Sequence, residues 1–301
     1  MRSRILQAPW TRARRVLGIN ARNLLYVHNL NRRRYFPLAD DKVRTKAALL
    51  ATGVPVPETI SVYTNLIEVS AAHEALREAG EFVIKPASGR RGGGIVVVEG
   101  HEGGNFRLPG GAVLPWEELR RAMGDILFGV HSVGQVDRVL VERRIHAHPA
   151  LANLASSGLP DIRVILLHGL PVMSMMRVPT ADSGGRANLH QGALGIAIRL
   201  SDGAAFRAAL RRQPVDRHPD HGAPLIGFKV PLWDQILEVA RRAAAALPLP
   251  YLGVDVVLAA EAGPVVMEVN VRPGLEIQNV NGRGLRRPLE RLARLQAGFV
   301  P

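Results

Sequence analysis

Three oxygen-bearing side chains lie on two late segments that are otherwise apolar. Asp255 lies in GVDVVL (253–258), and Glu268 and Asn270 lie in VMEVN (266–270). Residues two apart on a β-strand face the same side, and an antiparallel hairpin can bring Asp255 opposite them. Mg²⁺ takes oxygen ligands from carboxylates, phosphates and water. The pattern therefore predicts a Mg²⁺ site. The alternative, a charged face on an edge strand, is disfavoured because both segments are so apolar.

A lysine followed by a run of glycines forms a second candidate site. In IKPASGRRGGGIVVV (84–98), six residues separate Lys85 from Gly92, Gly93 and Gly94. Glycines allow successive backbone N–H groups to converge on an anion such as phosphate, and lysine adds a compact point charge. Only four of the 39 cationic residues are lysines, at positions 42, 46, 85 and 229. A glycine-rich hairpin beside a solvated lysine is the alternative.

A third cluster is rich in arginine. It spans DIRV (161–164), MMRVPT (175–180) and GGRANLHQG (184–192) and contains Asp161, Arg163, Arg177, Arg186, Asn188 and His190. Arginine can hold a carboxylate or a phosphate through two parallel hydrogen bonds. For His190 we favour a structural or orienting role over that of a base. In VERRI (141–145), a strand that carries Glu142 and Arg143 could present backbone groups to an adenine edge.

The elements that must position these residues are mostly strands that pair locally. Hydrophobic periodicity predicts helices at 40–52, 71–79, 116–128, 231–246 and 286–296. Strands are expected at 59–63, 81–86, 95–99, 138–145, 161–180 (as a pair), 194–200, 253–260 and 264–270, and residues 201–229 read as loops. This order favours an α+β fold with antiparallel sheets over a doubly wound parallel sheet. The glycine turn lies between two strands, so dinucleotide-binding and helix-forming phosphate loops fit poorly.

The charge of the 301-residue chain is strongly uneven. Its net charge is 39 − 26 = +13, and residues 1–34 hold nine arginines and no acid. Such a segment could contact an anionic membrane, nucleic acid or an acidic protein, or it could pack on its own domain. The absence of cysteine excludes disulfides, thiolate metal sites and cysteine nucleophiles. Nothing reads as a signal peptide or membrane span, which favours a cytoplasmic protein, with a peripheral membrane location as the further option.

Taken in order, IKPASGRRGGGI, DIRV, RANLHQG, GVDVV and MEVNVRPG resemble the ATP-grasp ligases. The likeness is to the glutamate-ligase branch that includes the ribosomal-protein-modifying enzymes, and more narrowly to the alpha-L-glutamate-ligase-like group. It extends from ADDKVRTKAALL to NVNGRGL, roughly 240 residues. The resemblance implies an ATP-grasp fold whose two lobes clamp a nucleotide. The expected domains are a basic arm at 1–39, an N-terminal lobe at 40–141 and a C-terminal lobe at 142–301.

The resemblance also implies roles for individual positions. Residues expected to bind ATP are Lys42, Lys85, Gly92, Gly93, Gly94, Glu142, Arg143, Asp161, Arg186 and Asn188. Lys85 would contact the phosphates, the turn 89–94 would cover them, Glu142 and Arg143 would lie at the adenine, and Asp161 at the sugar. Residues expected to hold Mg²⁺, or Mn²⁺ in its place, are Asp255, Glu268 and Asn270. Residues expected to stabilise an acyl-phosphate and orient the acid are Arg163, Arg177 and Arg272.

The implied reaction joins a carboxylate to an amine at the expense of ATP. The carboxylate would attack the γ-phosphate, and an amine, glutamate or another amino acid, would displace phosphate from the acyl-phosphate. Two alternatives stay open: a kinase on the same fold, and a nucleotide-binding module recruited to an acidic partner or a membrane by its basic arm. Only about 40 residues precede the match, where such ligases carry an α/β domain. We therefore expect the substrate site either to be truncated or to be completed by a partner or second subunit, including a homo-oligomer. Nucleic acid is disfavoured as a partner.

Overall fold

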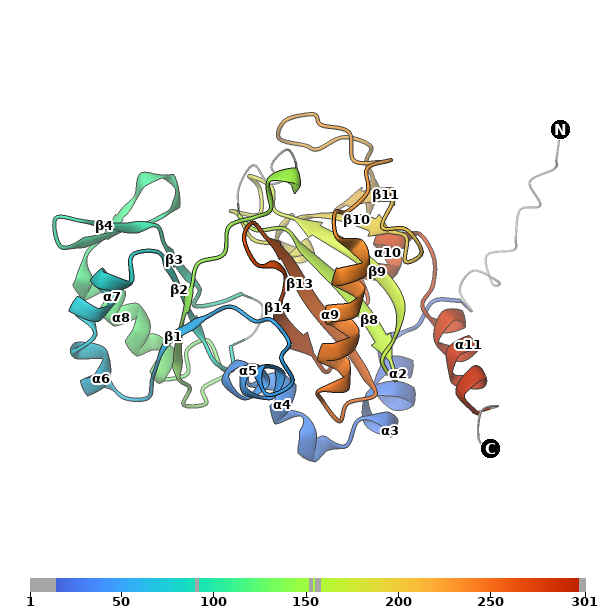
Figure 1. Ribbon diagram of the computed structural model, residues 1–301, viewed down its shortest axis with the longest axis horizontal. Coiled ribbons are helices and arrows are strands. Elements are labelled where there is room, and N and C mark those ends of the chain that lie inside the picture. Colours follow the sequence, from blue (N-terminus) through green and yellow to red (C-terminus); the bar gives the residue numbers. More distant parts are fainter. Residues whose placement is uncertain (1–14, 90–91, 152–153, 155–157, 298–301) are drawn as a thin grey trace. The chain divides into compact units, whose positions relative to one another are not determined.

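The computed structural model describes residues 15–89, 92–151, 154 and 158–297. The chain divides into two units. Unit 1 comprises residues 1–39, 48–55 and 147–301, and unit 2 comprises residues 40–47 and 56–146. Helices and antiparallel sheets make up both units, which confirms the predicted α+β class (Figure 1).

Unit 2 is built on a four-stranded antiparallel sheet in the order β1-β7-β2-β3, and a smaller sheet has the order β4-β5-β6. The strands of the larger sheet are β1 (Thr59–Tyr63), β2 (Phe82–Pro86), β3 (Val96–Val98) and β7 (Val139–Arg143). Those of the smaller sheet are β4 (Gly100–Glu102), β5 (Asn105–Arg107) and β6 (Val113–Leu114). Its helices are α6 (Leu66–Ser70), α7 (His73–Ala79) and α8 (Trp116–Leu127).

The core of unit 2 forms where α8 meets this sheet. Leu119, Met123 and Ile126 repeat at helical spacing on α8 and are fully buried. They join Phe82 and Ile84, which alternate on β2. Because Phe82 and Ile84 are buried on this face, the adjacent Lys85 lies on the other face of β2. The alternation of the strand therefore determines where the lysine points.

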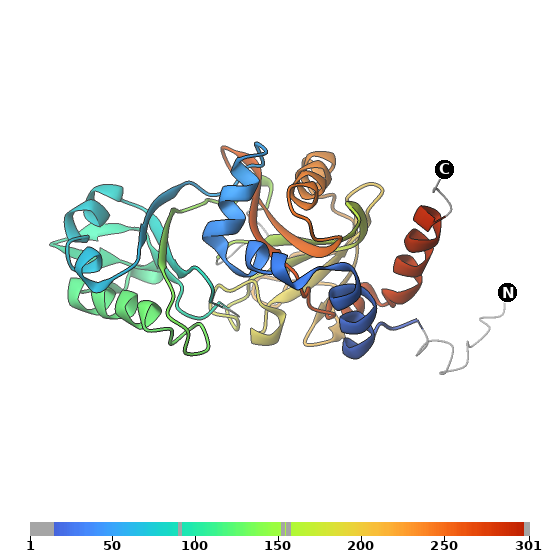
Figure 2. The same ribbon diagram turned by 90° about the horizontal axis from the view of Figure 1, so that it is seen from below.

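Unit 1 is built on a seven-stranded antiparallel sheet in the order β12-β11-β10-β9-β8-β13-β14. Its strands are β8 (Asp161–Leu167), β9 (Leu170–Val178), β10 (Leu194–Ile198), β11 (Ala205–Leu210), β12 (Gln213–Pro214), β13 (Tyr251–Ala259) and β14 (Gly263–Asn270). Helix α9 (Trp233–Ala245) runs along one face of the sheet in both views (Figures 1 and 2). Helices α10 (Ile277–Asn281) and α11 (Arg286–Ala297) follow β14.

The strands β11 and β12 correct the prediction that residues 201–229 are only loops. AFRAAL is rich in alanine and lacks the β-branched run that marks a strand, so its pairing with β10 is a tertiary effect. Helix α10 was likewise not predicted, because five residues are too few to show a helical period. The predicted strand 59–63 and helices at 116–128, 231–246 and 286–296 are confirmed to within a few residues.

Residues 15–39 are part of the packed structure of unit 1. They form α2 (Ile19–Arg22), a π-helical segment (Asn23–Val27), α3 (His28–Leu30), a 3₁₀ turn (Arg33–Tyr35) and α4 (Pro37–Asp40). Arg22 is buried and donates to the backbone carbonyls of Arg272 at 3.4 Å and Pro273 at 2.9 Å. Asn31 exchanges two hydrogen bonds with the backbone of Tyr251. The predicted membrane or partner contact of residues 1–34 falls in part on residues 1–14, outside the described residues.

Helix α5 (Lys42–Leu50) begins in unit 2 and ends in unit 1. Asp41 caps it, since its carboxylate accepts from the backbone N–H groups of Val43 at 3.0 Å and Arg44 at 3.2 Å. One turn apart, the helix carries Lys42 and Lys46, two of the four lysines of the chain.

Candidate active site

Unit 2 holds a buried cluster in which two lysines share one carboxylate. Val83 of β2 pairs with Glu142 of β7, so Lys85, two residues further, lies on the same face as Glu142. Glu142 is 2% exposed and forms ion pairs with Lys85 and with Lys46, the latter at 2.7 Å. Burial lowers the pKa of Lys46, and Glu142 opposes that shift. The cluster has one positive charge in excess, which suits it to an anion.

Lys46 is a residue that the sequence analysis did not assign to the site. Its side chain is buried among charges although α5 has little amphipathic character. Two signals could have identified it: the rarity of lysine in this chain and the four-residue spacing from Lys42, which places both on one helix face.

Hydrogen bonds link the first residue of helix α5 to the start of the glycine turn. The backbone N–H of Lys42 donates to the carbonyl of Ala87 at 2.9 Å, and its Nζ donates to the carbonyl of Gly89 at 3.1 Å. Gly94 has φ +72°, and a Cβ there would lie 2.4 Å from the ring of His131. Glycine is therefore required at 94 for both backbone and packing reasons. Residues 90 and 91 of the turn lie outside the described residues.

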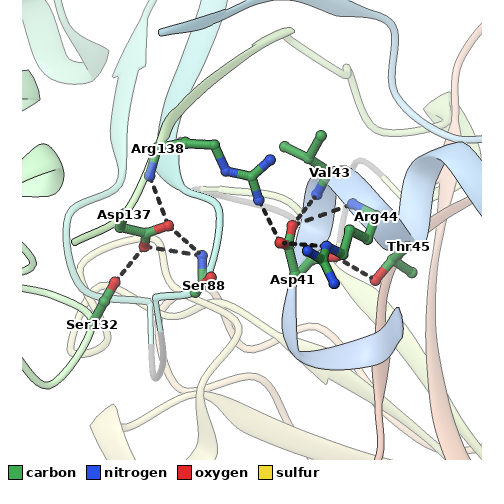
Figure 3. Close-up of polar contacts among 8 residues, drawn as sticks. All are labelled: Asp41, Val43, Arg44, Thr45, Ser88, Ser132, Asp137 and Arg138. Atoms are coloured by element: carbon green, nitrogen blue, oxygen red, sulfur yellow. Dashed lines mark hydrogen bonds and ion pairs between the residues drawn. The ribbon is translucent and has the colours of Figure 1, made fainter. Parts of the chain in front are cut away.

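Two aspartates fix the base of this turn (Figure 3). Asp137 accepts from the backbone N–H of Ser88 with both oxygens at 3.0 Å, from that of Arg138 at 2.8 Å and from the hydroxyl of Ser132. The side chain of Arg138 pairs with Asp41 at the start of α5. The strand–turn junction and the helix N-terminus are thus held by one chain of charge-assisted hydrogen bonds.

The side chains of Glu142 and Arg143, at the end of β7, point in different directions. The Glu142 side chain points into the lysine cluster, whereas Arg143 is exposed and donates to the carbonyl of Ala79 at 2.6 Å. Since the Glu142 carboxylate is already paired with two lysines, an adenine contact at this position would use backbone groups.

Unit 1 holds a second charged cluster on one face of its sheet. The register pairs Asp161 with Arg177, Arg163 with Asp255, and Asp255 with Glu268. Directly paired residues face the same side, so all five lie together across β9, β8, β13 and β14. Asn270, two residues after Glu268, donates to Asp255 Oδ2 at 3.2 Å.

Bidentate arginine–aspartate pairs hold this cluster. Arg163 donates to Asp255 at 2.7 Å and 2.6 Å, and Arg177 donates to Asp255 at 2.8 Å and to Asp161 at 2.6 Å. Burial raises the pKa of Asp161 to about 6, with Arg177 opposing and Asp255 adding to the shift. Burial also acts on Asp255, but Arg163 and Arg177 outweigh it and hold its pKa at about 2. The arginines are thus fixed in orientation by Asp255, which is buried, and by Asp161, which is largely buried.

The strands β13 and β14 carry the oxygen-bearing side chains that are candidates to hold Mg²⁺. Among the described residues no three His, Cys, Asp or Glu side chains are placed to hold a metal ion. Two carboxylates and one amide on adjacent strands nevertheless fit a cation that takes few protein oxygens and several from phosphates and water. The Asn270 Nδ2 points to Asp255, so its Oδ1 can serve as a ligand. Both oxygens of Asp255 accept hydrogen bonds from arginine, so Asp255 would have to exchange a guanidinium for the cation.

The remaining predicted residues of unit 1 lie on loops. Asn188 caps the 3₁₀ turn Leu189–Gln191 by accepting from the backbone N–H of His190 at 3.1 Å, and Arg186 is exposed on the same loop. Arg272 follows β14 with its guanidinium 4.7 Å from the ring centroid of Phe36. The structure therefore joins Asp161, Arg163, Arg177, Asp255 and Asn270 in one network within unit 1, while Lys42, Lys85 and the glycine turn belong to unit 2.

Comparisons with known proteins give one family match and several relatives. The model of the sugar-transfer associated ATP-grasp family matches residues 21–294. Two curated proteins named "Probable alpha-L-glutamate ligase" are similar to this chain. The protein of Sodalis glossinidius is 33% identical over 123 residues, which cover 41% of this chain and 30% of the relative. The protein of Psychromonas ingrahamii is 29% identical over 133 residues, which cover 44% of this chain and 33% of the relative. The chain thus spans about a third of the length of these relatives.

Among solved structures, that of the ATP-grasp ligase PsnB with a minimal precursor aligns at 15% identity and a TM-score of 0.49, over 89% of this chain and 63% of that one. The family model covers both charged clusters and the glycine turn between β2 and β3. Because that match extends over most of its length, the chain belongs to the sugar-transfer associated ATP-grasp family.

Proposed function

We propose that this protein is an ATP- and Mg²⁺-dependent carboxylate–amine ligase. The observation that carries the proposal is the different chemistry of the two clusters. In unit 2, Lys46 and Lys85 converge on the single carboxylate of Glu142, and in unit 1 oxygen-bearing side chains of Asp255, Glu268 and Asn270 lie on the adjacent strands β13 and β14. A triphosphate with its divalent cation needs both kinds of site. Membership of an ATP-grasp family supports this pairing.

In this proposal the residues of unit 2 bind the nucleotide. Lys85 and Lys42 contact phosphate oxygens, and the backbone of Gly92, Gly93 and Gly94 folds over them. Glu142 holds the Lys85 ammonium in a buried position, so the charge is in place before the nucleotide arrives. Backbone groups at Glu142 and Arg143 read the adenine, and Asp161 of unit 1 meets the sugar.

The residues of unit 1 hold the cation and the reacting groups. Glu268, Asn270 and Asp255 hold Mg²⁺, which supplies neutralisation of phosphate charge when bound. Arg163 and Arg177, oriented by aspartates, and Arg272 stabilise negative charge on the transferred phosphoryl group. Arg186 and Asn188 approach the same group from the loop 184–192.

The proposed reaction has two steps. A carboxylate oxygen of the acid attacks the γ-phosphorus, the bond to the β–γ bridging oxygen breaks, and ADP leaves. The amine nitrogen then attacks the acyl carbon, the C–O bond to phosphate breaks, and phosphate and a proton are released. The names of the two curated relatives favour an amino acid such as glutamate as the amine. A kinase of the same fold would stop after the first transfer and leave a stable phosphorylated product.

The test uses the full chain with Lys85→Ala and the exposed Lys229→Ala as its matched control. We expect Lys85→Ala to weaken Mg²⁺–ATP binding at least about tenfold, because a buried charge-assisted contact is lost, while Lys229→Ala binds as the parent does. In the parent, ADP release with Mg²⁺ should depend on adding both an acid and an amine. Unchanged ATP affinity in Lys85→Ala would refute the site, and ADP release without amine and with a stable phosphorylated acid would favour the kinase.

A second proposal concerns recruitment of the ligase to an anionic membrane. On the described part of the basic segment, Val16, Ile19, Leu24 and Leu25 are exposed, and Arg32, Arg33 and Arg34 are exposed beside them in sequence. Exposed apolar side chains near arginines are typical of surfaces that lie on anionic lipid. No helix in the described ranges has the length and apolar character needed to cross a bilayer.

The packing of residues 15–31 determines how recruitment is tested. Deletion of 1–34 would remove buried Leu17 and Arg22 from unit 1 and damage the fold. The informative variant is therefore Arg32→Gln/Arg33→Gln/Arg34→Gln, with sedimentation on vesicles of anionic or of neutral lipid. We expect salt-sensitive binding to anionic vesicles only, reduced in the variant. Equal binding of parent and variant would refute the role of these arginines.

A further inference from the structure

Lys46 lies inside the buried cluster of unit 2, yet the proposed reaction uses only its neighbour Lys85. The Nζ of Lys46 donates to Oε1 of Glu142 at 2.7 Å, while Lys85 pairs with the other oxygen, Oε2. All three side chains are buried. Because each ammonium group has its own carboxylate oxygen, one lysine can leave while the other keeps its contact with Glu142.

The register of the strands places Glu142 further than Lys85 from the glycine turn. Lys85 of β2 pairs with Leu140 of β7, and Glu142 pairs with Val83, two residues further from the turn. Two residues of an antiparallel strand span roughly 7 Å. A phosphate group held by the turn would therefore meet Lys85 before it met Glu142.

Helix α5 has the same order. The Nζ of Lys42, at the start of the helix, donates to the carbonyl of Gly89 in the turn. Lys46 lies four residues, about 6 Å, further along the helix, and from there its Nζ reaches Glu142. Lys46 is thus placed as the partner of Glu142 away from the turn, rather than as a second lysine for the phosphate.

The surroundings of Glu142 make an unpaired carboxylate costly there. Val83 and Leu140 are apolar and lie on the same face of the sheet as Glu142, and Leu140 is fully buried. Between the two lysines the interaction is repulsive. Burial lowers the pKa of Lys46, Glu142 raises it, and the charge of Lys85 lowers it again. Movement of Lys85 to a phosphate would relieve this repulsion, provided that Lys46 stays with Glu142.

We propose that Lys46 is a positioning residue that keeps Glu142 paired while the ammonium of Lys85 transfers from this carboxylate to a phosphate of ATP. The proposal deepens the ligase function and rests on it. Before ATP binds, the two lysines share Glu142. With ATP bound, Lys85 pairs with phosphate and Lys46 keeps the carboxylate, so each of these buried charges has a partner of opposite sign. The transfer exchanges one ion pair for another, and no covalent bond or proton changes place.

A double-mutant cycle on the full chain tests this role. Calorimetry measures Mg²⁺–ATP affinity for the parent, Lys46→Met, Glu142→Gln and Lys46→Met/Glu142→Gln, with the exposed Lys229→Met as the matched control. We expect Lys46→Met to weaken binding at least about tenfold, because Lys85 can then leave only by stranding a buried carboxylate. In the Glu142→Gln background, the same change should alter affinity by less than about threefold. Lys229→Met should bind as the parent does.

Two outcomes of the cycle would overturn the proposal. A Lys46→Met variant that binds Mg²⁺–ATP as tightly as the parent would show that Glu142 needs no second partner. An equal loss in both backgrounds would show that Lys46 acts on the nucleotide directly and not through Glu142.

Adenosine separates a positioning role from general damage to the site. It carries the base and the sugar but no phosphate, so Lys85 has no anion to which it can move. We therefore expect the parent and Lys46→Met to bind adenosine equally. A loss of adenosine affinity as large as the loss of ATP affinity would contradict the proposal, because Lys46 would then shape the whole site.

The cycle remains informative if Lys46→Met does not fold. Glu142→Gln and Lys46→Met/Glu142→Gln both lack the buried carboxylate, and the double variant has one buried charge fewer. These two variants should bind Mg²⁺–ATP within about threefold of each other. A double variant that binds at least about tenfold more weakly than Glu142→Gln would refute the role of Lys46.

Failure of this inference differs from failure of the ligase function. If Lys85→Ala loses ATP affinity and the parent releases ADP in an amine-dependent reaction, while Lys46→Met binds ATP as the parent does, only the role of Lys46 is wrong. If Lys85→Ala binds ATP as the parent does, the nucleotide site is wrong, and the transfer of Lys85 fails with it.

Discussion

The two charged clusters use different cations for different purposes. In unit 2, the compact ammonium groups of Lys46 and Lys85 converge on Glu142. In unit 1, the planar guanidinium groups of Arg163 and Arg177 bind aspartates through paired hydrogen bonds. Ammonium is a point charge that can move from carboxylate to phosphate, whereas a bidentate fork is fixed in direction. In a chain with 35 arginines among 39 cations, lysine at this position is consistent with a need for the point charge.

Their charge balance also differs. In the lysine cluster two ammonium groups converge on one carboxylate, whereas in the arginine cluster Asp255 accepts from two guanidinium groups and Asp161 from one of them. Buried surplus charge costs stability, so the lysine cluster is expected to become more stable when an anion binds.

The largest expected effect comes from Asp255→Asn, which removes the buried carboxylate shared by two largely buried arginines. We expect a loss of about 3–5 kcal/mol in the free energy of unfolding, because breaking a buried pair leaves uncompensated charge. Urea denaturation measures the loss. Asp202→Asn, which breaks an exposed pair with Arg199, serves as the control and should leave the midpoint unchanged. Equal effects of the two substitutions would mean that the buried network does not hold the sheet together.

Glu142→Gln tests the lysine cluster in the same way and should cost about 3 kcal/mol, since Lys46 and Lys85 lose the carboxylate with which both pair. The excess of lysines over carboxylates also predicts a stronger response of this variant to ATP. Saturating ATP should stabilise Glu142→Gln more than the parent in a thermal shift assay, because phosphate replaces the missing carboxylate. A smaller shift than in the parent would contradict the view that the lysines await an anion.

A pH effect distinguishes the arginine cluster from the lysine cluster. The pKa of Asp161 is raised from 3.8 to about 6 by burial, so between pH 4 and 6 the folded state binds more protons than the unfolded state. Stability from this group is therefore present below pH 4 and lost as the pH rises through 6, by as much as about 3 kcal/mol. Asp161→Asn should remove this slope from the curve of unfolding free energy against pH. An identical slope in the variant would show that another group is responsible.

The smallest expected effect on stability is that of Glu268→Gln, since Glu268 is only half-buried at the edge strand β14. We expect a change below about 1 kcal/mol, together with a clear loss in the Mg²⁺ dependence of nucleotide binding. Titration of Mg²⁺ at fixed ATP measures the dependence. A variant that keeps the parent's Mg²⁺ dependence would remove Glu268 from the proposed ligands.

Local sequence patterns were enough to predict the elements that carry the site. The alternation of Glu268 and Asn270, and the short turn back to Asp255, depend only on the period of a strand and on hairpin pairing, and the register bears out this arrangement. The glycine turn and Lys85 are likewise contiguous in sequence. Strand β11 was missed because its sequence is rich in alanine, and α10 because it is too short to show a helical period. The role of Lys46 was missed because a single lysine on a helix carries too weak a local signal.

By itself, the sequence determined which residues share a strand, which face of the strand each takes, and the family to which the motifs point, because these depend on neighbours a few residues apart. Only the tertiary structure decided that Arg163 meets Asp255 across 92 positions and that Glu142 joins two lysines. Those pairings follow from the strand order β9-β8-β13 and from helix docking. Burial and long-range pairing set them, and neither is encoded in the spacing of residues along the chain.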